Sequence, residues 1–173
     1  MSSGISIHTL SMQANQFAFA SDILINNEHL TTNLISPIVA NLSLACELFL
    51  KTMCKAQGVG FRRTHDLHSI FETLSTETQH IIHFDFLTLV SNRKLDVHRI
   101  SNENDVDYIL SLYNIDFDKF KCILYDMKDY FMHSRYPVIE EVIGFRINYL
   151  IILKNVLKKL SNDRYNDWYI VNK

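Results

Sequence analysis

Glycine and proline are scarce in this chain, which has only four Gly and two Pro among its 173 residues. A β-sandwich or β-barrel needs turn residues every few positions, so this scarcity argues against both architectures. The hydrophobic fraction of 47% and the charged fraction of 21% match a folded soluble protein and exclude disorder over most of the chain. We therefore expect a single, mainly helical domain spanning residues 1–173.

An excess of charge of one sign is also missing, since the formal net charge is only -2. The whole surface is therefore not that of a polyanion-binding protein, and any contact with nucleic acid must come from a local group of side chains. The three cysteines, Cys46, Cys54 and Cys122, form no CxxC pair. This sparse, odd set argues against a disulfide framework and predicts a reducing, cytoplasmic location.

Long apolar runs and the common catalytic motifs are absent as well. No uninterrupted run approaches the roughly 18 residues of a membrane span, and the first residues lack the basic region of a secretory signal, so we expect no membrane association. There is no Gly-rich phosphate loop, no GxSxG and no HExxH. His80 and His83 stand three apart without an acidic helix pair, so we predict neither a metal nor a cofactor.

Apolar residues at helical spacing predict a series of helices separated by short loops. The expected N-cap residues are Ser36, Thr64, Thr76 (in a capping box with Gln79) and Asp116, and Gly58 is expected to end the second helix. The polar segment 91–104 is predicted to be a loop, and a break is expected at Arg135–Pro137 because the residue before a proline disfavours helix. The predicted helices are 11–26, 37–57, 65–74, 77–90, 105–113, 117–131 and 138–160.

The first group of candidate functional residues is the pair Glu47 and Lys51, four residues apart on one face of the second helix. A solvated ion pair that adds a few tenths of a kcal/mol is the plain interpretation. The surrounding helix is unusually apolar, however, and a second interpretation places the pair at the border of a buried surface, where each charge needs further partners.

A denser group is Arg62-Arg63-Thr64-His65-Asp66-Leu67-His68, at the start of a predicted helix. Two arginines before a helix start can bind phosphate, and a histidine can exchange protons near neutral pH. Simple capping of the helix by Asp66 is the alternative interpretation.

The segment Tyr130–Pro137 joins two long predicted helices and contains His133, Arg135 and Tyr136. The structural interpretation pairs the arginine with Glu140 or Glu141 and packs the tyrosine over the break. The functional interpretation places the arginine on a phosphate and the tyrosine against a base.

Three stretches of the sequence resemble, in order and spacing, the HEPN domain family: SLACELFLKTMCKAQG, RRTHDLHSIFETL and DYFMHSRYP. The resemblance covers about residues 38–75 and 125–145, and leaves 1–30, an insert at 76–120 and a C-terminal tail at 162–173 unmatched. It implies an all-α, antiparallel up-and-down bundle of about five to seven helices that often forms a homodimer. Family members include ribonuclease toxins and bacterial defence proteins, and many pair with a nucleotidyltransferase.

The resemblance leads first to a domain that binds a nucleotide or RNA, in a toxin–antitoxin or defence system. Arg63 and Arg135 would hold phosphate in a groove shared with His65, and Tyr136 would stack on a base. The predicted ligand-binding residues are Glu47, Lys51, Arg62, His65, Asp66, His133, Arg135 and Tyr136.

A second hypothesis is a metal-independent endoribonuclease. Catalytic HEPN members carry an Arg followed after four to six residues by a His. This spacing occurs at Arg63–His68 and at Arg93–His98 with four intervening residues, and at Arg62–His68 with five. Roughly one such pair is expected by chance. After Arg135, the usual place of the motif, no His follows within seven residues. A third hypothesis is a non-catalytic partner or antidote subunit, in which the arginine segments serve the fold alone.

Overall fold

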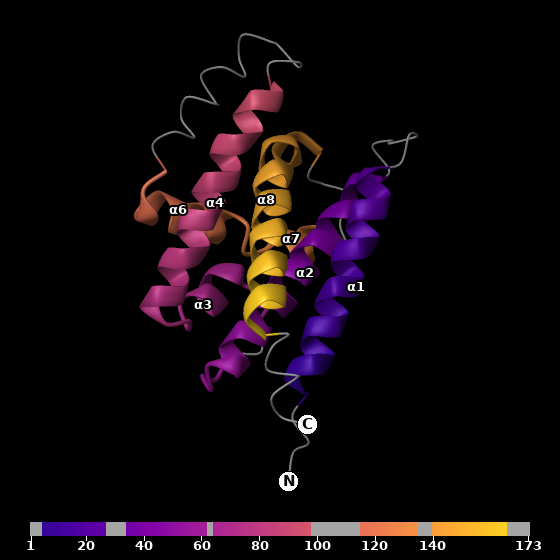
Figure 1. Cartoon of the computed structure of the whole chain (residues 1–173). Coiled ribbons are helices and arrows are strands. Elements are labelled where there is room, and N and C mark those ends of the chain that lie inside the picture. The colour runs from indigo at the N-terminus through magenta and orange to yellow at the C-terminus, as the bar shows by residue number, and fades with distance from the viewer. Residues whose placement is uncertain (1–4, 27–33, 62–63, 98–114, 135–139, 166–173) are drawn as a thin grey trace.

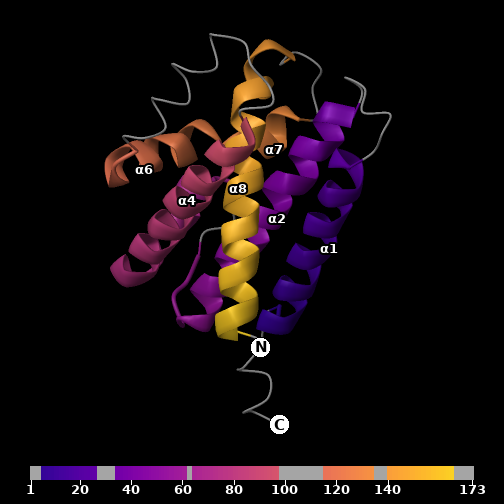
Figure 2. The same ribbon diagram turned by 45° about the horizontal axis from the view of Figure 1, so that its top comes forward.

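The structure is a computed structural model that describes residues 5–26, 34–61, 64–97, 115–134 and 140–165. Within these ranges every regular element is a helix, so the predicted all-α helical bundle is confirmed. Long helices run up and down beside one another (Figure 1): α1 (Ile7–Ile25), α2 (Ile35–Ala56), α4 (Thr76–Val97) and α8 (Glu140–Tyr165). The shorter helices α3 (Leu67–Phe71), α6 (Phe117–Asp126) and α7 (Tyr130–His133) lie around α2 and α4 (Figure 2).

Helix α2 is the centre of the bundle, because it packs against α1, α8, α3 and α7. Leu42, Phe49 and Leu50 on this helix are completely buried. Among the described helices, α2 is also the one long and apolar enough to cross a membrane by length and composition, but 67% of its most apolar window is buried inside the bundle. Burial of the apolar faces of α2 against four neighbours is a main source of the stability of the fold.

A cluster of phenylalanines connects the shorter helices to the long ones. Phe120 of α6 lies edge-on to Phe71 of α3, with ring centroids 5.5 Å apart, and 5.0 Å from Phe86 of α4. All three rings are buried, and such pairs contribute about 0.5–1.5 kcal/mol beyond the burial of their area. This cluster holds α3, and with it the segment that precedes it, in a fixed place on the bundle.

Helix α1 begins four residues earlier than the predicted range of 11–26. Ser6 is its N-cap, and the Oγ atom of this serine accepts a hydrogen bond of 3.0 Å from the backbone N–H of Thr9. The prediction missed this start because residues 7–10 add only one residue, Leu10, to the buried face. The start of α1 is set by its N-cap, Ser6, and not by an apolar face.

The start of α2 also differs from the prediction that Ser36 is its N-cap. The helix begins at Ile35, with Leu34 in the cap position and no capping side chain. Pro37 then sits within the first turn, where the backbone N–H groups have no intrahelical acceptor and the missing one costs nothing. The predicted end is confirmed: Gly58, just beyond the helix, has φ of +69°, a conformation that favours glycine.

Of the three remaining predicted N-caps, Asp116 is confirmed, and Thr64 and Thr76 are wrong. The carboxylate of Asp116 accepts a hydrogen bond of 2.8 Å from the N–H of Lys119 at the start of α6. At α3 the cap is Asp66, which accepts from the N–H of Ser69 at 3.1 Å. Thr64 instead accepts a bond from the N–H of Asp66, so it orders the approach to the helix.

Helix α4 extends further than predicted. It starts at Thr76, one residue before the predicted start, because the capping side chain is that of Ser75, whose Oγ accepts a hydrogen bond of 3.3 Å from the N–H of Thr78. It continues to Val97, so the prediction of a loop at 91–104 is wrong for residues 91–97. These seven residues lack an apolar stripe, but Arg, Lys and Leu among them favour helix intrinsically, which is enough to continue a helix that is already formed. Because α4 packs along α8, the segment 76–97 is part of the bundle.

The region after α4 contains further differences. The predicted helix over 117–131 is divided, since α6 ends at Asp126 and α7 is a separate short helix. The final helix, α8, covers 140–165 where 138–160 was predicted. The predicted helix at 105–113 and the break at Arg135–Pro137 lie outside the described residues.

Candidate functional site

The candidate site begins with an ion pair on α2, just before that helix ends. The Nζ atom of Lys51 lies 2.6 Å from Oε1 of Glu47, as the spacing of four residues predicts. The same ammonium donates a hydrogen bond of 3.0 Å to the backbone carbonyl of Thr64, in the segment leading to α3. Only 4% of the Glu47 side chain and 12% of the Lys51 side chain are exposed. The pair is therefore buried and not the solvated pair of the plain interpretation.

The second oxygen of Glu47 holds a histidine. Nδ1 of His65 lies 2.8 Å from Oε2 of Glu47, and the imidazole ring is tilted against Phe131 of α7 with centroids 4.6 Å apart. In the neutral ring this contact favours the tautomer with the proton on Nδ1, because a carboxylate can only accept. The other ring nitrogen, Nε2, is then left with its lone pair for a ligand.

Exposure distinguishes the two partners of this contact. The His65 side chain is 46% exposed, while the carboxylate that holds it is buried. Each oxygen of Glu47 has a partner, one cationic and one imidazole, so the buried charge is compensated by groups of fixed position. A surface histidine oriented by a buried carboxylate is the arrangement that acid–base sites use.

Asp66, the next residue along the chain, caps helix α3. Its two carboxylate oxygens accept hydrogen bonds from the N–H of Ser69 at 3.1 Å and from the Oγ of Ser69 at 2.6 Å. Partial burial alone would raise the pKa of this carboxyl, but the two bonds from Ser69, helped by His68, lower the pKa below its usual value. The hydrogen bonds of Asp66 therefore agree with the capping interpretation.

His68, a predicted catalytic residue, lies near Glu72 and Tyr125 and not against Glu47. Its Nε2 is 3.9 Å from Oε1 of Glu72, beyond hydrogen-bonding distance, and its ring meets Tyr125 of α6 edge-on at 5.8 Å. Glu72 is instead paired with Lys121 at 2.9 Å. Of His65 and His68, it is therefore His65, predicted as a binding residue, that has a carboxylate partner able to fix its tautomer.

Several predicted site residues cannot be placed against this geometry. Arg62, Arg63, His98, Arg135 and Tyr136 lie outside the described residues. Arg93 and His133 fall within α4 and α7, but their side chains also lie outside what the structure describes.

The start of α3 is in contact with α7 through one pair of rings. The contact between His65 and Phe131 brings the start of α3 against α7, although the two residues are 66 positions apart in the sequence. Arg62 and Arg63 precede His65 by three and two residues, and Arg135 follows Phe131 by four. All three arginines lie outside the described residues, so the groove shared by Arg63, His65 and Arg135 stays a prediction.

Sequence reasoning missed the pairing of Glu47 with His65. The one available signal was an acidic residue in the middle of an apolar helix, since a buried carboxylate requires partners. Nothing in the sequence showed which of several histidines supplies one. In the part of the chain that the structure describes, no group of three or more His, Cys, Asp or Glu side chains is suited to hold a metal ion.

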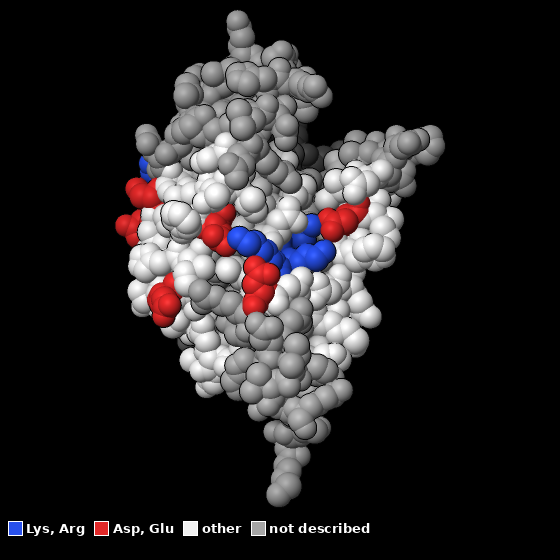
Figure 3. All heavy atoms as spheres, viewed as in Figure 1, with Lys and Arg blue, Asp and Glu red and all other residues white. Residues whose placement is uncertain are grey.

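Basic side chains do not form a continuous field on the face seen in Figure 3. There, Lys and Arg atoms lie between groups of Asp and Glu atoms. Any attraction for a polyanion must therefore be local, as the balanced net charge also indicates.

No protein-family model, curated protein or solved structure gives a significant match to this chain.

Proposed function

We propose that this chain is a HEPN-like helical domain that binds RNA or a nucleotide at the surface around His65. The observation that carries the proposal is the contact of 2.8 Å between Nδ1 of this half-exposed histidine and the buried carboxylate of Glu47. Fixing one ring nitrogen restricts the rotation of the imidazole and directs the other nitrogen to a ligand, which lowers the entropy lost on binding. The resemblance of the chain to HEPN domains supplies the class of ligand.

Charge around the histidine favours an anionic ligand. Lys51 balances Glu47 at 2.6 Å, so the buried part of the site is neutral as a pair. Arg62 and Arg63 adjoin the site in the sequence and would add positive charge in the planar form that binds phosphate by two parallel hydrogen bonds. The sugar–phosphate backbone of RNA supplies such phosphates together with hydroxyl groups that hydrogen-bond an imidazole.

A binding titration tests this proposal. The full chain is titrated at low salt with a fluorescently labelled single-stranded RNA, and with mononucleotides by calorimetry. We expect His65→Ala to weaken binding by about tenfold or more, which is about 1.4 kcal/mol. His80→Ala is the matched control, because this exposed histidine stacks on Phe117 at a ring distance of 4.5 Å and has no contact with Glu47. Absence of binding to all of these ligands, or equal affinity of both variants, refutes the proposal.

A second candidate function, a metal-independent endoribonuclease, is favoured by the same oriented histidine. Nε2 of His65 would accept the proton of a 2′-hydroxyl while its oxygen attacks the adjacent phosphorus. The bond from phosphorus to the 5′-oxygen then breaks, giving a 2′,3′-cyclic phosphate, and the 5′-oxygen takes a proton from an acid, for which His68 and His98 are candidates. Arg63 or Arg93 would stabilise the charge of the phosphorane.

Incubation of the purified chain with total RNA in EDTA separates the two functions. Cleavage that is lost in His65→Ala and reduced in Glu47→Gln, but retained in His80→Ala, supports the nuclease. Loss of cleavage in His68→Ala or His98→Ala with normal cleavage by His65→Ala would instead favour the Arg-x4-His pairs. Intact RNA together with measurable affinity leaves the binding function. A chain that neither binds nor cleaves RNA fits a non-catalytic partner or antidote subunit.

A further inference from the structure

The ammonium of Lys51 is enclosed by the protein itself. It lies 2.6 Å from Oε1 of Glu47 and donates a second hydrogen bond of 3.0 Å to the carbonyl of Thr64. The ring of Phe61 is a third neighbour, with its centroid 5.5 Å from Nζ. Only 12% of the Lys51 side chain is exposed. A lysine that binds phosphate presents its charge to the ligand, so these contacts argue against the direct role in binding that the sequence predicted.

The same two charged residues of α2 hold His65 at two places. The carbonyl of Thr64 belongs to the planar peptide group that ends at the nitrogen of His65, so the bond from Lys51 fixes the backbone of the histidine. The ring is fixed by Oε2 of Glu47, 2.8 Å from Nδ1. Because Glu47 and Lys51 are themselves paired, these four residues form a closed ring of contacts around the peptide bond before His65.

The segment is also fixed on the other side of the histidine. The backbone N–H of Asp66 donates a hydrogen bond of 3.1 Å to Oγ1 of Thr64, and the carboxylate of Asp66 caps α3. His65 therefore stands between two anchored residues, while its own side chain is 46% exposed. The arrangement leaves the imidazole open to solvent but gives its backbone little freedom.

We propose that Lys51 is a positioning residue, which holds the backbone of His65 for ligand binding and does not itself touch the ligand. This inference rests on the proposed binding function around His65. Without the bond from Lys51 to the carbonyl of Thr64, the segment gains freedom that each binding event must remove, and this lost entropy weakens binding. The lysine thus contributes to affinity through the histidine.

The salt dependence of binding separates a positioning lysine from one that contacts phosphate. A cation that neutralises one phosphate of a single strand contributes about 0.7 to the slope of log K against log salt concentration. We expect Lys51→Met to bind a labelled single-stranded RNA about fivefold more weakly than the native chain, with the slope unchanged. A slope reduced by about 0.7 would show a direct contact and overturn the inference.

Two further variants of α2 accompany this titration. Lys55→Met is the matched control, because Lys55 lies one turn further along the same helix and bonds to the carbonyl of Ile5. It should keep the native affinity. Lys51→Arg should recover at least half of the lost affinity on a logarithmic scale, since a guanidinium can bridge a carboxylate and a carbonyl. Circular dichroism confirms that each variant is folded.

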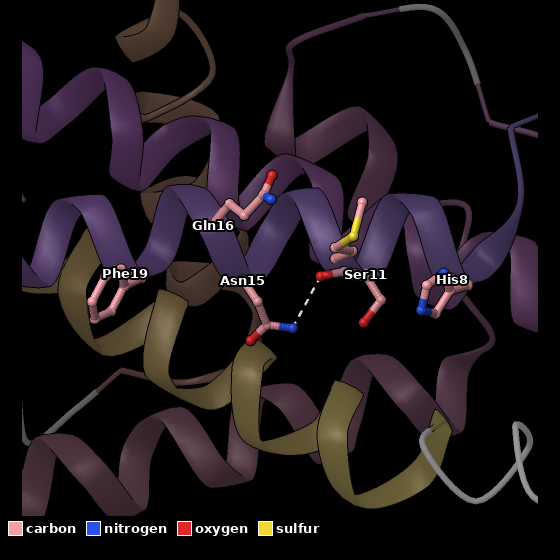
Figure 4. A pocket seen from close by; sticks show the side chains of 6 residues that line it. His8, Ser11, Asn15, Gln16 and Phe19 are labelled. Carbon is pink, nitrogen blue, oxygen red and sulfur yellow. Dashed lines mark hydrogen bonds between the residues drawn. The ribbon is translucent and has the colours of Figure 1, made fainter.

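A double-mutant cycle tests whether Lys51 acts through His65. If it does, the double variant Lys51→Met/His65→Ala should bind no more weakly than His65→Ala alone. The control cycle replaces His65 by His8, which lines a shallow hollow formed by residues of α1 alone (Figure 4). There the effects of the two substitutions should add. Losses that add in both cycles would overturn the inference.

An NMR measurement without ligand keeps the inference separate from the proposed function. We expect the ¹⁵N order parameter of the His65 amide to be near 0.85 in the native chain and in Lys55→Met, and to fall towards about 0.6 in Lys51→Met. An unchanged value in Lys51→Met overturns the positioning role and leaves the binding function standing. A native chain that binds no RNA or nucleotide refutes the binding function, and with it the use of this positioning for a ligand.

Discussion

Lys154 of α8 is paired with Asp22 of α1, with 2.5 Å between Nζ and Oδ1, although 132 residues separate them in the sequence. The lysine side chain is only 3% exposed, whereas the aspartate is 36% exposed. Lys158, one turn later, lies 3.9 Å from the other oxygen of the same carboxylate. The buried ammonium thus depends on one partly exposed carboxylate, which ties the first helix of the bundle to the last.

We predict that Asp22→Ala destabilises the chain much more than a surface ion pair would. Its loss leaves the buried ammonium of Lys154 without its anion, at a cost of about 2–3 kcal/mol after allowance for the exposure of the aspartate. Asp85→Ala is the control, because its partner Lys159 is exposed and 3.6 Å away, and it should cost less than about 0.5 kcal/mol. Urea unfolding measures both. Equal free energies of unfolding for the two variants would contradict the prediction, and Asp22→Ala/Lys154→Met should recover part of the loss.

A similar argument applies to Glu47. We predict that Glu47→Ala lowers the free energy of unfolding by about 3 kcal/mol, because Lys51 is left buried beside an empty position. Glu72→Ala removes a carboxylate that is largely solvated and should cost less than about 0.5 kcal/mol. Denaturant unfolding of the two variants and of Glu47→Gln/Lys51→Met gives the comparison, and a small effect of Glu47→Ala would show that Lys51 finds another partner.

The ring of His65 reports on the same carboxylate by a different measurement. We predict that long-range ¹H–¹⁵N NMR spectra of the neutral ring show the Nδ1–H tautomer in the native chain, since Oε2 of Glu47 accepts at 2.8 Å. In Glu47→Ala the usual preference for the Nε2–H form should return. His80, which stacks on Phe117, serves as the internal reference in both spectra. An unchanged His65 pattern would mean that the carboxylate does not set the tautomer.

Features that depend on residues close together in the sequence could be predicted, whereas contacts between distant segments could not. The end of α2 at Gly58, the cap of α6 at Asp116 and the pairing of Glu47 with Lys51 are local, and all three were predictable from short-range rules. The contact between Glu47 and His65 spans 18 residues and depends on how α3 packs. Periodicity fixes which face of a helix is buried, but not which histidine of a neighbouring segment meets it.

Hydrophobic periodicity did not predict two other features, the full length of α4 and the exposure of Phe19 on α1. The charged end of α4 has no apolar stripe and is held by propagation from the turns before it, which a periodicity search does not register. In α1 apolar residues occur on the outer face as well as on the buried one, and Phe19 is 64% exposed. The composition of a helix does not separate a buried apolar side chain from an exposed one, and only packing does.

Asp66 makes the stability of the chain depend on acid. Hydrogen bonds from Ser69 hold its folded-state pKa below the ordinary value, against the opposing effect of burial. Its contribution is therefore full above the unfolded-state pKa of about 4 and is lost as the pH falls through the lower folded-state pKa. We predict that Asp66→Asn, which keeps a capping side chain, makes the fall of Tm below about pH 4 shallower. Ser69→Ala should have a partial effect, and an acid slope of Asp66→Asn equal to that of the native chain would contradict this assignment.

The three thiols should differ sharply in reactivity towards iodoacetamide. Burial raises the pKa of Cys46, which is completely buried in α2, and the nearby Lys154 only partly opposes this effect. Burial likewise raises the pKa of Cys54, whose Sγ lies 3.1 Å from Oγ1 of Thr73. Since the thiolate is the reactive species and must also be reached by the reagent, we predict that only the exposed Cys122 is alkylated in the folded chain. Mass spectrometry should then show one adduct in native buffer and three in urea. A Cys122→Ser variant that still gains an adduct at the native rate would show that α2 opens at its centre, where Cys46 and the Leu150 carbonyl of α8 are in contact at 3.8 Å.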